Sequence, residues 1–200
     1  MKKNLNLFIA GYLIFLLLSV FSCSDCSGGG GRYSVTSFDV QNKKVVFDNE
    51  TYSTLDIDAN SVSYNEYAIL IEPMMQSVAA KRAFLTTTAY ACSPADPIYE
   101  DKFLDLQITS TSDYNTNFTA GTNLTSLFDV IFYEEYVSSQ QRMDLETYLN
   151  TNPVISLETM LVLKTPPTNT NQFSFTVNMD IQGDDLNDFE FTTETIEITL

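Results

Sequence analysis

The sequence predicts an all-β protein: an antiparallel β-sandwich that contains one short helix. This sandwich follows an N-terminal export signal that is cleaved off. Three observations support this fold class. Past Arg32, apolar and polar residues alternate with a period of two almost throughout. Clusters of Asn, Asp, Gly, Pro and Ser separate the alternating segments, as turns do. About nine short strands with alternating faces, and a single stretch of helical spacing, favour two packed antiparallel sheets.

Residues 1–22 have the order of a secretory signal. Lys2 and Lys3 precede an apolar run from Phe8 to Phe21, which spans about 21 Å as a helix and falls short of the ~30 Å hydrocarbon core. The segment Val20-Phe21-Ser22-Cys23 resembles the lipobox of bacterial lipoproteins. We therefore expect residues 1–22 to be removed and Cys23 to carry the lipid anchor. The alternative is an ordinary secretion signal with a coincidental cysteine.

Residues 23–32 form a leader that contains Cys26 and Gly28 to Gly31. If Cys23 is acylated, Cys26 and Cys92 remain in an exported, disulfide-permissive compartment. A bridge between them would stabilise the fold by about 4 kcal/mol in the chain-entropy model. The alternative is two unpaired thiols, with the glycines as a flexible stalk. A single sandwich domain is predicted over residues 33–200.

Seven strands are predicted before the C-terminal region: 34–40, 44–47, 53–57, 67–72, 84–91, 103–109 and 155–163. Within residues 138–153, Leu145, Tyr148 and Leu149 lie at i, i+3 and i+4 and predict one short helix. Residues 172–181 alternate strictly and pair with residues 189–200 in a predicted antiparallel hairpin. The alternation changes phase at Thr192 and Thr193, which predicts a bulge.

Composition excludes several classes of function. The chain has 10 Lys and Arg against 26 Asp and Glu, a net charge of −16, which argues against nucleic acid as a partner. It contains no His and no Trp. Without His, the chain cannot form a Ser-His-Asp or Cys-His catalytic group, a His-containing zinc site or a non-haem iron triad. No cofactor and no catalytic residue is predicted.

The chain resembles uncharacterised lipoproteins of about 200 residues from Bacteroidota. The resemblance rests on CSDC (Cys23 to Cys26), AYACSPADP (Ala89 to Pro97), GTNLTSLF (Gly121 to Phe128) and the closing FSFTVNMDIQGDD and TETIEITL segments. It implies an immunoglobulin-like or related sandwich and supplies no active site to transfer. It also implies a place in the cell envelope as an outer-membrane lipoprotein, with the periplasmic or surface face left open.

Two carboxylate groups are candidates for chemistry. Asp180, Asp184, Asp185 and Asp188 form an acidic hairpin tip that is a weak calcium candidate, because its spacing departs from the known calcium-loop pattern; Asp56 and Asp58 are weaker still. Glu134 and Glu135, or a more distant pair, could act as acid and base in a glycosidase.

The leading functional prediction is a non-catalytic, membrane-anchored module for binding or envelope structure. Its partners would be the membrane, through the lipid, and an unidentified protein or glycan ligand. The alternative is a carboxylate-dependent hydrolase acting on polysaccharide, and a minor alternative is a calcium-stabilised adhesin.

Overall fold

A computed structural model describes residues 32–48, 51–78, 98–133, 140–183 and 185–200. The chain divides into two units, residues 1–32 with 79–98 and residues 33–78 with 99–200; the description that follows concerns the second. Within the described ranges, no helix is long and apolar enough to cross a membrane.

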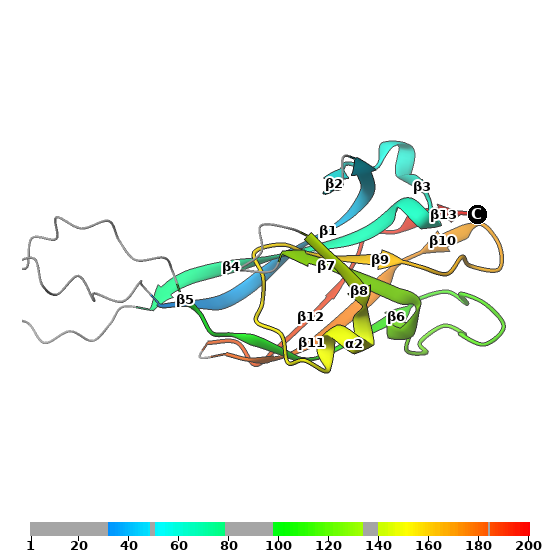
Figure 1. The fold of residues 1–200 in the computed structure, drawn as a ribbon. Coiled ribbons are helices and arrows are strands. Elements are labelled where there is room, and N and C mark those ends of the chain that lie inside the picture. The colour runs from blue at the N-terminus through cyan, green and yellow to red at the C-terminus, as the bar shows by residue number, and fades with distance from the viewer. Residues whose placement is uncertain (1–31, 49–50, 79–97, 134–139, 184) are drawn as a thin grey trace, which may run out of the picture. The chain divides into compact units, whose positions relative to one another are not determined.

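The largest sheet has seven strands (Figure 1). Its order is β2 (Thr51–Leu55), β1 (Arg32–Asp48), β4 (Tyr67–Val78), β9 (Thr159–Leu163), β7 (Phe128–Tyr133) and β8 (Gln140–Asp144), and β5 (Ile98–Tyr99) also pairs with β1. The β1–β2, β4–β9, β7–β9 and β7–β8 pairs are antiparallel. These strands are rich in the β-branched and aromatic residues that favour a pleated, half-buried surface.

Two smaller sheets complete the fold. In one, β11 (Phe175–Gln182) lies between β12 (Asp188–Thr192) and β6 (Lys102–Ser110) and is antiparallel to both. In the other, β13 (Ile196–Thr199) lies between β10 (Asn171–Phe173) and β3 (Ser61–Ser63) and runs parallel to β3. Three 3-10 turns, η1 (Asp58–Asn60), η2 (Tyr64–Glu66) and η3 (Thr125–Leu127), connect strands.

The main core lies between the large sheet and the two smaller ones. Alternate residues of the large sheet and of β6, β10, β11 and β13 are buried in one hydrophobic cluster, among them Tyr67, Ile69, Phe128, Leu161, Phe103, Phe173, Phe175, Val177 and Ile198. Phe175 stacks edge-on against Phe128 across the two layers, with ring centroids 5.8 Å apart. The predicted all-β antiparallel sandwich is therefore confirmed.

The opposite face of the large sheet is buried too. A second cluster contains Val45, Ala68, Leu70, Ile131, Met160 and Val162, with Tyr52 packed against it. The edge strands β2 and β8 stand at opposite ends of the strand order, yet the Gln140 side chain connects them. The Gln140 amide accepts from the Tyr52 N–H at 2.5 Å and donates to the Tyr52 carbonyl at 2.8 Å. The sheet thus curls until its two edges are joined around the second cluster.

The predicted strands 34–40 and 44–47 are a single strand, β1. The sequence Gln41-Asn42-Lys43 reads as a turn because Asn often closes turns with its own side chain. Here the Asn42 side chain is occupied elsewhere: it accepts from the Tyr67 hydroxyl at 2.7 Å and donates to the Glu194 carbonyl at 2.8 Å. Those tertiary bonds keep the backbone extended through the polar stretch.

The predicted continuous strand 172–181 is divided between two sheets. It breaks at Ser174, whose carbonyl accepts from the Thr111 N–H at 3.0 Å, so that β10 pairs with β13 while β11 pairs with β12. The phase change at Thr192 and Thr193 likewise marks a change of sheet rather than a bulge, because β12 ends at Thr192 and β13 begins at Ile196 in the other sheet. Strands that change sheets at corners are a known feature of sandwiches. The β11–β12 half of the predicted hairpin is confirmed.

The predicted helix is present as α2 (Leu145–Leu149) and buries Leu145, Tyr148 and Leu149. Asp144 begins it by accepting from the Thr147 N–H, as N-cap residues do. The strand predicted over 155–163 is shorter in the structure, where β9 begins only at Thr159. Strands β7 and β8 form where the sequence predicts no strand. The strand predicted over 84–91 lies outside the described residues.

Candidate functional site

An open cavity of about 390 Å³ lies beside the middle of β1. Its walls come from three segments that are far apart in the sequence: β1, the connection from β2 to η1, and the turn between β12 and β13. The lining residues are Val40, Gln41, Asn42, Lys43, Asp56, Ile57, Asn60, Glu194, Thr195 and Ile196. We call this cavity the polar pocket. Its volume falls in the range of small-molecule sites, about 300–1,000 Å³.

Asn42 fixes one wall of the polar pocket to the core. Its side-chain oxygen accepts from the hydroxyl of Tyr67, a residue that is completely buried, and its amide donates to the Glu194 carbonyl. Burial raises the pKa of Tyr67 far above its ordinary value, although a hydrogen bond with Thr193 opposes that rise. The phenol is therefore a neutral donor at any working pH, and it holds the Asn42 amide in one orientation.

Lys43 and Asp56 place an ion pair in the polar pocket. The Lys43 ammonium lies 2.5 Å from a carboxylate oxygen of Asp56. The Lys43 side chain is only 17% exposed, whereas that of Asp56 is 90% exposed. The hydrogen bond from Lys43 lowers the pKa of Asp56. The pair thus gives the pocket a charged donor on a largely covered side chain and a charged acceptor on an exposed one.

The loop that carries Asp56 has an unusual backbone. Ala59 and Asn60 have φ values of 57° and 52°, in the left-handed region. Asn tolerates this region because its side chain bonds locally, but a Cβ without such a bond costs about 1–2 kcal/mol there. Strain of this kind persists where the surroundings impose it and gathers at ligand sites. The wall that faces Lys43 is therefore held in a defined shape.

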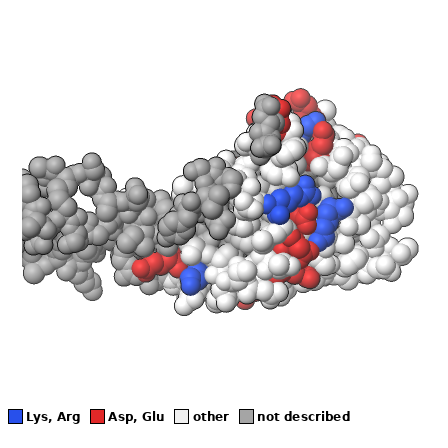
Figure 2. All heavy atoms as spheres, in the orientation of Figure 1, with Lys and Arg blue, Asp and Glu red and all other residues white. Residues whose placement is uncertain are grey.

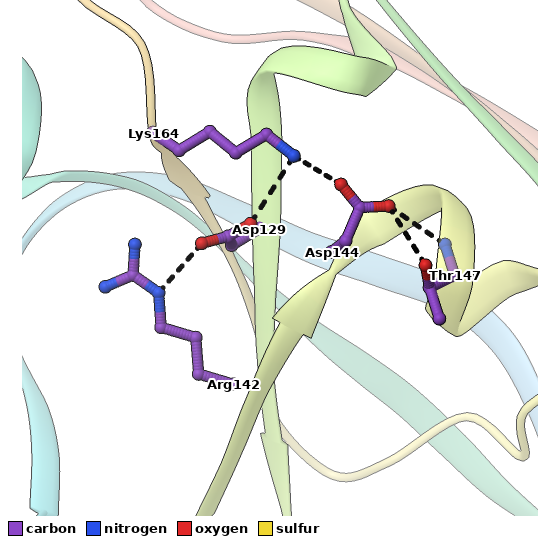
Figure 3. A network of polar contacts seen from close by, with 5 residues as sticks. All are labelled: Asp129, Arg142, Asp144, Thr147 and Lys164. Carbon is purple, nitrogen blue, oxygen red and sulfur yellow. Dashed lines mark hydrogen bonds and ion pairs between the residues drawn. The ribbon is translucent and has the colours of Figure 1, made fainter.

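A second polar cluster lies on β7, on β8 and at Lys164, the residue after β9, and Figure 3 shows it closely. Asp129 and Asp144 are direct cross-strand partners. Arg142 bonds Asp129 at 3.0 Å, while Lys164 contacts Asp129 at 3.6 Å and also bonds Asp144. The hydrogen bond from Lys164 lowers the pKa of Asp144, with help from the Thr147 backbone. A carboxylate that is held in its charged form is a poor general acid. The cluster therefore has a structural role, in which it connects the strands to the N-cap of the helix.

Charges on this side of the protein are balanced locally. On the face that Figure 2 shows, basic side chains lie beside acidic ones rather than in a separate patch. Arg142 also lies 6.0 Å from the ring centroid of Tyr52, the residue whose backbone Gln140 bonds. The cluster therefore supports the closed edge of the large sheet and offers no uncompensated charge to a ligand.

A smaller cavity of about 280 Å³ lies between residues 113–119 and 168–171. Its polar groups are engaged in hydrogen bonds within the first loop and between the two loops. Asp113 accepts from the Ala120 N–H, Asn115 accepts from the Phe118 N–H, and the Thr168 N–H donates to the Tyr114 carbonyl. We read this cavity as the space between two packed loops.

The structure describes only some of the sequence-predicted site residues. Cys23, Cys26, Cys92, Glu134, Glu135 and Asp184 lie outside the described residues. Asp180 and Asp188 are direct partners in the β11–β12 pair, with Asp185 in the turn between those strands. In the described ranges, no group of three or more His, Cys, Asp or Glu residues could hold a metal ion. Calcium binding at this tip stays a prediction.

Sequence reasoning missed the polar pocket. In the sequence, Asp56 stands out only as an acidic neighbour of Asp58, and Asn42 and Lys43 fall between two predicted strands. The one sequence signal for the site is a polar triplet, Gln41 to Lys43, inside an otherwise alternating strand. Tertiary contacts from residues more than a hundred positions away complete the pocket, and no local pattern encodes them.

No protein-family model matches the chain, and neither does any curated protein. Solved structures give weak matches. The C-terminal domain of the Streptococcus agalactiae AgI/II polypeptide BspA is 10% identical, with 81% of this chain covered and a TM-score of 0.24. A second solved structure, BspA_C_mut, is 14% identical, with 82% of this chain covered and a TM-score of 0.24. The chain spans about half the length of these structures, 50% and 47%.

Proposed function

We propose that the protein is an exported, membrane-anchored binding module whose ligand site is the polar pocket. The observation that carries the binding role is the pocket itself, an open cavity of about 390 Å³ lined by the Lys43–Asp56 ion pair and by the Asn42 amide, which two hydrogen bonds hold in place. Small-molecule sites are concave and place a few fixed polar groups against an apolar wall. Here the partly buried Val40 and Ile57 supply the apolar part of the lining.

Anchoring is supported by the sequence of residues 1–26. A short apolar run, a small residue and Cys23 stand in the order that precedes lipid attachment. Two or more acyl chains give stable membrane binding, whereas one gives only marginal binding. The envelope location and a Cys26–Cys92 bridge belong to the same proposal.

Growth of the native host with radiolabelled palmitate tests the anchor. We expect label on the wild-type chain and on Cys26→Ala, and none on Cys23→Ala. Label that persists on Cys23→Ala would contradict the anchor assignment. Protease treatment of intact cells then separates the two membrane faces, because a surface domain is digested before lysis and a periplasmic domain only after it.

Native mass spectrometry of the full chain, purified from its host in detergent, tests the binding role. We expect a bound small molecule on the wild type and on Lys44→Met, and a loss of that molecule from Lys43→Met. Lys44 is a matched control, because it is the next residue on β1 and forms its own ion pair with Glu66 at 2.8 Å. No bound molecule on any of the three proteins would count against the pocket as the ligand site.

One observation favours the hydrolase as a second candidate. Glu158 and Glu72 flank the paired residues Thr159 and Ile71 on neighbouring strands. Partial burial raises the pKa of Glu158, and the charge of Glu72 raises it further. A carboxyl group with a raised pKa is what the general acid of a glycosidase needs. Release of reducing ends from polysaccharide by the wild type and not by Glu158→Gln would establish this activity, and equal release by both would dismiss it.

A further inference from the structure

We infer that the polar pocket takes a neutral sugar unit, held through two neighbouring hydroxyl groups by Lys43 and Asp56. This inference rests on the proposed function and names the chemical class of its ligand. It follows from the charge of the lining, from the donor and acceptor set, and from the placement of apolar residues among the polar ones.

The charge of the lining disfavours an anion. Lys43 is the single basic residue among the lining residues, and Asp56 and Glu194 are both acidic. Asp39 stands next to the pocket, where it accepts from the Gln41 amide at 2.8 Å. The whole chain carries a net charge of −16, so a carboxylate or phosphate would meet an unfavourable field as well as the competing carboxylate of Asp56.

The same lining disfavours a cation. Lys43 already places one positive charge in the lining, and its ammonium would repel a second. Within the described part of the chain, no three acidic or thiol side chains gather to hold a metal ion. The lining therefore suits a ligand that is polar but uncharged.

The donor and acceptor set matches hydroxyl groups. An ammonium has three donors and no acceptor, and the bond to Asp56 uses one donor; a carboxylate has about four acceptor positions. A hydroxyl both donates and accepts. One sugar hydroxyl can thus accept from Lys43 while its neighbour donates to Asp56, and the Lys43–Asp56 bond of 2.5 Å keeps both groups close enough to reach adjacent hydroxyls.

The remaining lining residues fit the rest of a sugar ring. Gln41 and Thr195 add polar groups from two different walls, and the partly buried Val40 and Ile57 give apolar surface for the ring carbons. A ligand that bears many hydroxyls on an apolar ring uses both kinds of surface. The Asn42 bonds to Tyr67 and Glu194 hold one wall in place before the ligand arrives, which lowers the cost of ordering on binding.

Saturation-transfer NMR on the full chain in detergent tests the inference. The probes are neutral sugars (glucose, galactose, mannose and N-acetylglucosamine, with their short oligomers) and acidic sugars (glucuronic acid and sialic acid). We expect saturable binding of at least one neutral sugar and at least tenfold weaker binding by Lys43→Met and by Asp56→Ala. The matched controls Lys44→Met and Glu66→Ala alter the neighbouring ion pair and should bind as the wild type does.

Each other outcome has a defined meaning. Preference for an acidic sugar, or tighter binding by Asp56→Ala, would overturn the neutral-sugar inference in favour of an anion site. No sugar binding, with a different molecule lost from Lys43→Met in native mass spectrometry, would overturn the inference and leave the binding role standing. No ligand in either experiment would overturn both. Equal thermal transitions of all four variants confirm that each is folded.

Discussion

The hydrogen bond between Asn42 and Tyr67 offers the sharpest test of how the polar pocket is built. Tyr67 is completely buried in the main core, and its hydroxyl donates to the Asn42 side-chain oxygen at 2.7 Å. Replacing Asn42 with Ala removes this acceptor and also the donor to the Glu194 carbonyl. The first change leaves a buried hydroxyl without that partner, and the second removes a more exposed bond.

The expected magnitude follows from those two losses. A buried polar group that loses its partner costs about 1–3 kcal/mol, and an ordinary hydrogen bond contributes about 0.5–1.5 kcal/mol. Thr193 lies close enough to hydrogen-bond the Tyr67 hydroxyl, which keeps the first term at the lower end. We therefore expect Asn42→Ala to lower the free energy of unfolding by about 2 kcal/mol.

A double-mutant cycle separates the orphaned hydroxyl from the other losses. Tyr67→Phe alone should lower the free energy of unfolding by about 1 kcal/mol. The double variant should lose about 1 kcal/mol less than the sum of the single variants, because the hydroxyl that loses its acceptor in Asn42→Ala is then absent. Urea denaturation of all four proteins, analysed by linear extrapolation, measures each term. Gln41→Ala, which loses only an exposed bond to Asp39, is the control and should change stability by less than about 0.5 kcal/mol. Strict additivity of the two variants would refute the reasoning.

Three further predictions concern other parts of the fold. Gln140→Ala removes two hydrogen bonds to the β2 backbone and should lower the free energy of unfolding by about 1–3 kcal/mol. Gln107→Ala, which removes an exposed hydrogen bond to Asp105, is the control and should not lower it. Equal urea midpoints for the two variants would contradict the joining of β2 and β8. The buried Tyr148 hydroxyl has no hydrogen-bond partner in the described ranges, so Tyr148→Phe should keep or raise the melting temperature, and a clear fall would show a missed partner. Lys164 lowers the pKa of Asp144 below its ordinary 3.8, so this pair stabilises the fold above about pH 4, and that stability is lost as the pH falls through the lowered pKa. In Lys164→Met, the free energy of unfolding should therefore fall less steeply as the pH is lowered below about 4. An unchanged pH dependence would count against the pair.

The sequence predicted the class of fold because alternation is a local signal. The buried faces of β6 and β11 follow directly from every second residue being apolar. Helix α2 was equally visible, since Leu145, Tyr148 and Leu149 recur at helical spacing. These elements need only their own residues to be recognised.

The topology could not be predicted in the same way. Ser174 and Thr193 look like ordinary polar strand residues, yet the chain changes sheets beside each of them. The reason lies in partners from distant segments, such as Thr111 against Ser174. The two edges of the large sheet are likewise joined by Gln140 and Tyr52, which are 88 positions apart.

The candidate site shows the same division. The acidic residues can be read from the sequence, but the role of each carboxylate depends on which lysine or arginine lies beside it in the fold. Asp56 stands opposite Lys43, while Asp144 stands beside Lys164 and serves a helix cap. One of these carboxylates lines a cavity and the other ties strands together, and composition alone does not distinguish them.

The most direct test of the proposed function is the comparison of Lys43→Met with Lys44→Met in ligand binding. The two lysines are adjacent on β1, each forms one ion pair, and only Lys43 lines the polar pocket. We predict that the full chain loses its bound ligand when Lys43 is replaced and keeps it when Lys44 is replaced. Equal retention by both variants, with both folded, would contradict the assignment of the pocket as the binding site.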